Sequence, residues 1–70
     1  MEIGKLVKAR RESLGISRKQ LGEMVNVKPA MISHIENGRR KVSAKRAAAF
    51  ESALGIPKTE LVPEIFGEAA

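Results

Sequence analysis

Few side chains in this sequence could carry out covalent chemistry. The chain holds one histidine, no cysteine and no aspartate, so its 8 acidic residues are all glutamate. These glutamates fall on separate predicted helix faces and have neither the paired-carboxylate nor the nucleophile–base spacing of a catalytic site. No group of cysteines and histidines has the spacing of zinc ligands. The sequence therefore predicts a protein that is not an enzyme and that uses neither a metal nor a cofactor.

The single histidine belongs instead to a strip of side chains suited to recognition. Positions i, i+1, i+4, i+5 and i+8 share one face of a helix. Short and nearly uncharged residues occupy such a face here: Pro29, Ala30, Ser33, His34 and Asn37. Ile32 and Ile35 fall on the opposite face, which we expect to be buried. A small polar surface of this kind suits the floor of a groove better than open solvent.

A shorter helix is predicted before this one. Ser17 and Gln20 have the spacing of a capping box, in which each side chain bonds the backbone amide of the other residue. The apolar residues of this first helix share one face: Leu21, Met24 and Val25. Asn26 tolerates positive φ and is expected to end the helix.

Pro29 is expected to begin the second helix, because its missing N–H costs nothing in a first turn. This helix is expected to run to about Asn37 and to end at Gly38. Gly22 costs about 1 kcal/mol relative to alanine inside the first helix, which indicates close packing at this position. Two helices joined by a tight turn, the second with a small polar face flanked by cations, describe a helix-turn-helix motif. Such a motif lays its second helix in the major groove of DNA.

Three further helices are predicted around this pair. The first covers residues 3–13 and ends at Gly15. Ser43 is expected to cap a fourth helix of the chain, whose buried face is Ala47, Phe50, Ala53 and Leu54. Gly55 should end that helix in a Schellman-like turn, and Pro57 should open a short fifth helix that runs to about Val62. The sequence thus predicts an all-α, compact five-helix domain over residues 1–62, followed by a short tail, 63–70.

Charge is distributed unevenly along the 70 residues. Residues 1–46 hold 12 Lys and Arg and 4 Glu, a net charge of +8, whereas residues 47–70 hold 1 Lys and 4 Glu, a net charge of −3. The cationic part contains the helical pair and favours a polyanionic partner. No apolar run reaches the roughly 18 residues of a membrane span. The start of the chain is too highly charged for a signal peptide, so we expect a cytoplasmic protein with no membrane contact.

Several short motifs resemble the phage repressor and Cro family of helix-turn-helix proteins, also called the XRE type. They are Leu14-Gly15-Ile16-Ser17, Gln20-Leu21-Gly22, Val25-Asn26-Val27, Ile32-Ser33, Ile35-Glu36-Asn37-Gly38-Arg39-Arg40 and Leu54-Gly55-Ile56. The resemblance covers residues 3 to about 62. It implies a five-helix, lambda-repressor-like domain that binds a two-fold double-stranded DNA operator as a homodimer and regulates transcription.

The resemblance also implies roles for individual residues. The base-contacting positions are Pro29, Ala30, Ser33 and His34. Ser33 and His34 would hydrogen-bond to bases, whereas Pro29 and Ala30 could only touch a thymine methyl group or let the backbone approach closely. The residues expected to contact phosphate are Arg10, Arg18, Lys28, Asn37, Arg39, Arg40 and Lys41. The consecutive cations at 39–41 are expected to form a phosphate clamp beside the groove.

Arg11 would lie near an apolar face, where an unpaired cation is costly. The resemblance implies a structural ion pair with Glu36, and a solvent-facing Arg11 with a buried stem is the alternative. The chain departs from the family at Lys28, where Ser or Thr is common, and at Arg18, where Gln is common. Both changes move interactions from bases to the DNA backbone. We therefore expect modest sequence specificity and a steep salt dependence.

The end of the chain leaves alternatives open. The resemblance places the dimer contact around the fourth and fifth helices, so the expected dimer or partner contacts are Ile56, Leu61, Ile65 and Phe66. Phe66 could instead fold back on its own domain. The main alternative function is an antitoxin that binds its own operator while its tail holds a toxin protein. A helical protein-interaction module that has lost DNA binding is a second alternative, which the cations of residues 39–46 disfavour.

Overall fold

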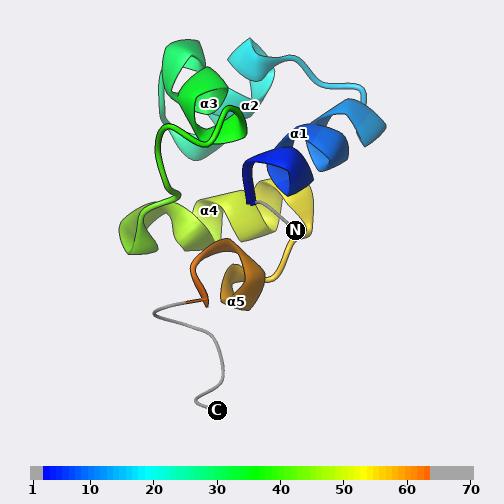
Figure 1. Ribbon diagram of the computed structural model, residues 1–70. Helices are drawn as coiled ribbons and strands as arrows, with labels where there is room; N and C mark the ends of the chain where they lie inside the picture. The colour runs from blue at the N-terminus through cyan, green and yellow to red at the C-terminus, as the bar shows by residue number, and fades with distance from the viewer. Residues whose placement is uncertain (1–2, 64–70) are drawn as a thin grey trace.

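The computed structural model describes residues 3–63 and contains helices in the order that the sequence predicts (Figure 1). They are α1 (Ile3–Ser13), α2 (Arg18–Val25), α3 (Pro29–Glu36), α4 (Ala44–Leu54) and α5 (Lys58–Leu61). Within this range the chain has five helices and no strand, which confirms the all-α fold class. In Figure 1, α4 runs below α1, α2 and α3, and α5 packs against α4. None of these helices has the length and apolar character needed to cross a membrane.

The ends of α2 follow the predicted local chemistry. The Ser17 hydroxyl accepts from the Gln20 amide at 3.0 Å, and the Ser17 amide donates to the Gln20 side chain at 2.8 Å. Asn26 ends the helix in the left-handed region, with φ 60 and ψ 46. The amides of Asn26 and Val27 both donate to the Gly22 carbonyl, so the turn into α3 begins with fixed geometry.

Three other helix ends differ in detail from the sequence-based expectation. Helix α3 stops at Glu36, one residue before Asn37. Ser43 occupies the N-cap of α4, yet its side chain makes no capping hydrogen bond within residues 3–63. Gly55 ends α4 in the left-handed region, but a single bond from its amide to the Glu51 carbonyl, 2.8 Å long, replaces the paired bonds of a Schellman turn.

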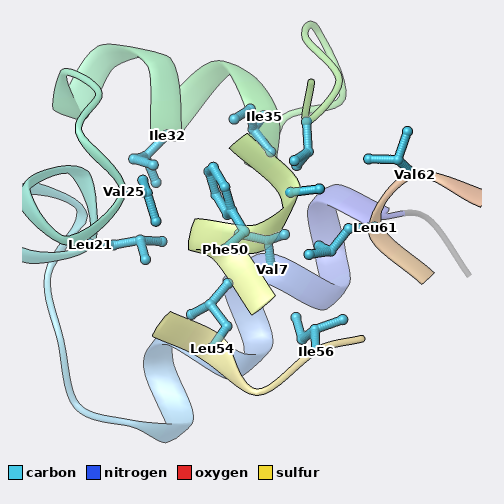
Figure 2. Packing of buried hydrophobic residues seen from close by; sticks show 12 residues of the cluster. Val7, Leu21, Val25, Ile32, Ile35, Phe50, Leu54, Ile56, Leu61 and Val62 are labelled. Carbon is cyan, nitrogen blue, oxygen red and sulfur yellow. The ribbon is translucent and has the colours of Figure 1, made fainter. Parts of the chain in front are cut away.

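The core gathers around Phe50, which is fully buried on α4 (Figure 2). Every helix contributes to it: Val7 from α1, Leu21 and Val25 from α2, Ile32 and Ile35 from α3, Leu54 from α4 and Leu61 from α5. Met24, expected on the buried face of α2, is instead 53% exposed. The buried side of α2 is formed instead by Leu21, Gly22 and Val25.

The structure corrects the expected role of Ile56 and Leu61. Both side chains are 1% exposed and pack in the core of a single chain, so they offer no surface to a second copy or another partner. Ile56 is buried because the chain folds back after Gly55, and Leu61 because α5 closes this end of the core. Ile65 and Phe66 lie outside the described residues, and so do all residues of the predicted tail except Pro63.

Two glycines allow backbone segments to touch. A Cβ atom on Gly4 would collide with the carbonyl oxygen of Ile35 and would lie 2.7 Å from that of Glu36. A Cβ atom on Gly22 would lie 2.5 Å from the carbonyl oxygen of Val27. Gly4 therefore lets α1 approach the last turn of α3, and Gly22 lets α2 approach the turn before α3. Together these contacts fix where α3 lies.

Candidate nucleic-acid interface

Helix α3 divides into a buried face and an exposed face. Ile32, Ile35 and Glu36 are buried. The predicted base-contacting residues lie on the other side: Pro29, Ala30 and His34 are exposed and Ser33 is half-buried. Asn37, just past the helix end, is also exposed, and its side-chain amide donates weakly to the Ser33 hydroxyl at 3.5 Å. The structure thus brings these five residues together as one outward surface, which we call the reading face.

An open hollow of about 400 Å³ borders the reading face on the side of α4. Its lining comes from the turn, from α3 and from the start of α4: Asn26, Val27, Lys28, Ala30, Met31, His34 and Arg46. Val27 and Met31 are half-buried and give this hollow its apolar character. The strip predicted from helical spacing did not include these two residues. The outward surface is therefore wider than the strip of five residues predicted from helical spacing.

Exposed cations lie at both ends of α3. Lys28 is the N-cap residue of α3 and makes no side-chain capping bond within the described chain. At the other end, the amides of Arg39 and Arg40 donate to the His34 carbonyl at 2.8 and 3.2 Å, so the loop folds against the last turn of α3. The side chains of Arg39, Arg40 and Lys41 remain exposed. This arrangement places positive charge beside a nearly uncharged reading face.

Arg10 is not part of this group. It is exposed on the last turn of α1, and Figure 1 shows that end of α1 on the opposite side of the molecule from the loop between α3 and α4. A contact between Arg10 and phosphate would have to form at a different part of the surface.

A buried ion cluster holds α3 to α1 and α2. The Glu36 carboxylate is 0% exposed and accepts from Arg11 Nε at 2.7 Å and from Arg11 Nη2 at 3.3 Å. Arg11 also donates to the Ile16 carbonyl at 2.9 Å. The Arg11 side chain is only 9% exposed, so it does not adopt the alternative solvent-facing arrangement. The hydrogen bond that Arg11 donates to Glu36 raises the pKa of Arg11 above its ordinary value, although burial acts in the opposite direction.

Arg18 joins the same carboxylate, which sequence reasoning did not predict. Its Nε donates to Glu36 Oε1 at 3.1 Å while its side chain stays 44% exposed. A signal for this contact is present in the spacing, because Arg18 precedes the buried residues Leu21 and Val25 by three and seven positions. That spacing turns the stem of Arg18 toward the side of α2 that faces α3.

Arg46 makes a second unpredicted contact. Its Nη1 donates to the carbonyls of Asn26 and Val25, at 3.0 and 3.3 Å, so a cation on α4 satisfies the C-terminal end of α2. A positive charge is favourable there, because the helix dipole is negative at that end. Arg46 lies four residues before the buried Phe50, a spacing that indicates its inward direction. The contact braces the turn that leads into α3.

Comparison with known proteins gives one family match and several similar structures. The family model described as "Helix-turn-helix" matches residues 7–61. The P22 c2 repressor protein, solved in complex with a synthetic operator, superposes with a TM-score of 0.82 and 30% identity over 87% of this chain and 92% of that chain. The clp gene regulator ClgR of Corynebacterium glutamicum superposes with a TM-score of 0.76 and 29% identity, covering 94% of this chain and 70% of that chain.

Curated relatives from vertebrates also match. Endothelial differentiation-related factor 1 of Homo sapiens is 32% identical over 56 residues, which are 80% of this chain and 38% of that protein. The homologue from Gallus gallus matches over the same proportions. The present chain thus spans well under half the length of these relatives.

Proposed function

Because the chain belongs to the helix-turn-helix family, we propose that it is a transcriptional regulator that binds double-stranded DNA with α3 in the major groove. The observation that carries this proposal is the reading face: a nearly uncharged, outward surface on the second helix of the motif, with exposed cations at both ends. The P22 c2 repressor, which shares the fold at 30% identity and was solved with an operator, supports DNA as the partner.

Each group of residues has a distinct role in this proposal. Ser33 and His34 hydrogen-bond to base edges, and Pro29 and Ala30 contact thymine methyl groups or let the backbone approach closely. Lys28 and the cations of 39–41 contact phosphates, as Asn37 does through its side-chain amide. Phosphate contacts position the protein on the duplex, whereas the few base contacts select the sequence. Specificity is therefore modest.

We further propose that two copies bind a two-fold operator. Helix α3 has 8 residues and is about 12 Å long, which corresponds to only about four base pairs of DNA. A second copy doubles the number of bases read. In this proposal residues 1–62 form the DNA-binding unit of each copy, the tail 63–70 supplies contacts between copies, and half-site centres lie about 34 Å apart.

Titration with duplex DNA at several salt concentrations tests the proposal. A dimer that neutralises roughly 6 to 10 phosphates loses about 10³- to 10⁵-fold in affinity between about 50 and 200 mM salt. Affinity for duplex that does not change with salt would contradict this function.

The reading face is tested separately by selecting bound duplexes from a random pool. A dimer recovers paired, inverted half-sites, whereas a single half-site would exclude the two-fold arrangement.

The phosphate clamp has a matched control within the chain. Arg40→Glu reverses one exposed charge beside α3, and Lys58→Glu makes the same charge change on α5, at the far side of α4. We expect Arg40→Glu to lower duplex affinity at least about tenfold, because it replaces attraction to a phosphate with repulsion, and Lys58→Glu to change it by less than about threefold. Equal effects of the two variants would show that Arg40 contributes to duplex affinity only through the net charge of the protein.

A further inference from the structure

Glu36 is shared by two guanidinium groups, which leaves one of the two positive charges in excess. Arg11 binds both carboxylate oxygens and is almost entirely buried, so these two residues form a complete ion pair. Arg18 reaches one of the same oxygens from α2 and carries the uncompensated charge. The excess charge is thus located on the member of the cluster that is 44% exposed.

The bond to Glu36 uses only one of the five N–H groups of Arg18. Within residues 3–63, the Nε–H is the one side-chain group of Arg18 that donates a hydrogen bond, to Glu36 Oε1 at 3.1 Å. The four N–H groups on Nη1 and Nη2 remain available. Because Nε is held, the guanidinium plane has a fixed anchor, and less side-chain entropy is lost when its other edge binds a ligand.

The position of Arg18 is suited to an anion that lies along α3. Arg18 is the first residue of α2, where the helix dipole is positive. It is bonded to the last residue of α3, directly before Asn37 of the reading face. Lys28 lies at the opposite end of α3. Two cations therefore bracket the helix that we place in the groove.

We propose that Arg18 binds a DNA backbone phosphate through its terminal nitrogens, and that Glu36 positions it by holding Nε. This inference rests on the proposed function and adds to it a buried acidic residue that acts on DNA binding through an arginine. An arginine is required at position 18, because it can bond a carboxylate with Nε and a phosphate with Nη1 and Nη2 at once. Lysine carries one ammonium group and has no second edge for the phosphate.

The test compares two substitutions that keep the positive charge. Arg18→Lys should weaken duplex binding about tenfold, as expected for the loss of a charge-assisted hydrogen bond. Lys58→Arg, on α5 at the far side of α4 from α3, should change affinity by less than about twofold. Circular dichroism and the urea midpoint of each variant establish that affinity is compared between folded proteins. Equal affinities of native protein and Arg18→Lys would overturn the positioning role.

A scan with single methylphosphonates, which remove the charge of one phosphate at a time, identifies the contact itself. The native protein should lose about tenfold in affinity at one phosphate per half-site, and Arg18→Lys should lose less than about threefold at that phosphate. The affinity of Arg18→Met should not change when that phosphate is replaced by a methylphosphonate. Its salt slope should be lower than that of the native protein by about one per half-site. An arginine with a purely structural role would lower the urea midpoint and leave both the scan and the slope unchanged, which refutes the inference.

The outcomes separate the inference from the function on which it rests. A native protein that binds no duplex even at low salt refutes the proposed function. A native protein that binds duplex with a steep salt dependence, while Arg18→Lys and Arg18→Met bind equally well, refutes only the role of Arg18 and Glu36.

Discussion

Replacing Glu36 with glutamine is the sharpest test of how α3 is held. Its carboxylate has no exposed surface and accepts from Arg11 at 2.7 and 3.3 Å and from Arg18 at 3.1 Å. Glutamine has nearly the same shape, so the change leaves little cavity. It does replace one acceptor oxygen with an NH₂ group that faces arginine donors, and it removes the negative charge. Arg11, only 9% exposed, is then left as a buried cation without a counter-charge.

Breaking a buried ion pair by removing one partner costs about 3 to 5 kcal/mol. At roughly 0.05 to 0.15 kcal/mol per residue, a chain of 70 residues has a total stability of only about 4 to 10 kcal/mol. Glu36→Gln should therefore remove a third or more of the free energy of unfolding. Glu23→Gln, an exposed glutamate on α2, should change that free energy by less than about 0.5 kcal/mol.

Urea unfolding followed by far-ultraviolet circular dichroism measures this difference. We expect a lower midpoint with an unchanged dependence on urea, because the folded state buries the same surface. The apolar double variant Arg11→Met with Glu36→Leu should be more stable than Glu36→Gln alone, since it leaves no unpaired buried charge on Arg11. A loss below about 1 kcal/mol for Glu36→Gln would refute the reasoning.

The same ion pair predicts a simple pH dependence. Pairing raises the pKa of Arg11 in the folded protein above its unfolded value, so its stabilisation is complete below the unfolded value and is lost only as pH rises through the folded one. Both values lie far into the alkaline range. We therefore expect the deficit of Glu36→Gln to be the same at about pH 7 and about pH 9. Gly4→Ala should lower the free energy of unfolding by about 1 to 3 kcal/mol in urea unfolding. Its methyl group would collide with the Ile35 carbonyl, which is backbone and not a side chain that can move aside. An unchanged urea midpoint would show that α1 shifts without cost. At Asn26, where φ is 60, Asn26→Ala should lower the free energy of unfolding by about 1 kcal/mol, whereas Asn26→Gly should change it by less than about 0.5 kcal/mol. Equal urea midpoints for the two variants would contradict the role of backbone strain. Arg46→Met should cost about 1 to 2 kcal/mol by leaving the Val25 and Asn26 carbonyls without their donor, and faster amide exchange at residues 26–28 should accompany the loss.

Local chemistry made most of the fold predictable. The capping box at Ser17 and Gln20, the positive φ of Asn26 and the glycines at 15, 38 and 55 each depend on residues close in sequence, and the structure confirms them. Phe50 was placed in the core by helical spacing alone. These features need no knowledge of how the helices are arranged.

Contacts between distant segments were harder to predict. The approach of Gly4 to α3 and the bonds from Arg46 to the turn depend on the angles between helices, which spacing within one helix does not give. The phosphate contact expected of Arg18 came from the family resemblance, whereas its bond to Glu36 joins residues 18 positions apart and was not predicted. Ile56 and Leu61 were expected at a dimer or partner contact but are buried in the core of one chain, and their position near the end of the sequence gave no information on which face α5 covers.

The contact between Gly4 and the end of α3 has a consequence for engineering. Helix α1 meets α3 at the carbonyls of Ile35 and Glu36, and α3 is anchored further by side chains that point inward. None of these attachments involves the five residues of the reading face. The residues that attach α3 to the rest of the domain thus differ from the residues that it exposes. Exchanging the five residues of the reading face should therefore change which DNA sequence the domain binds while leaving its melting temperature nearly constant.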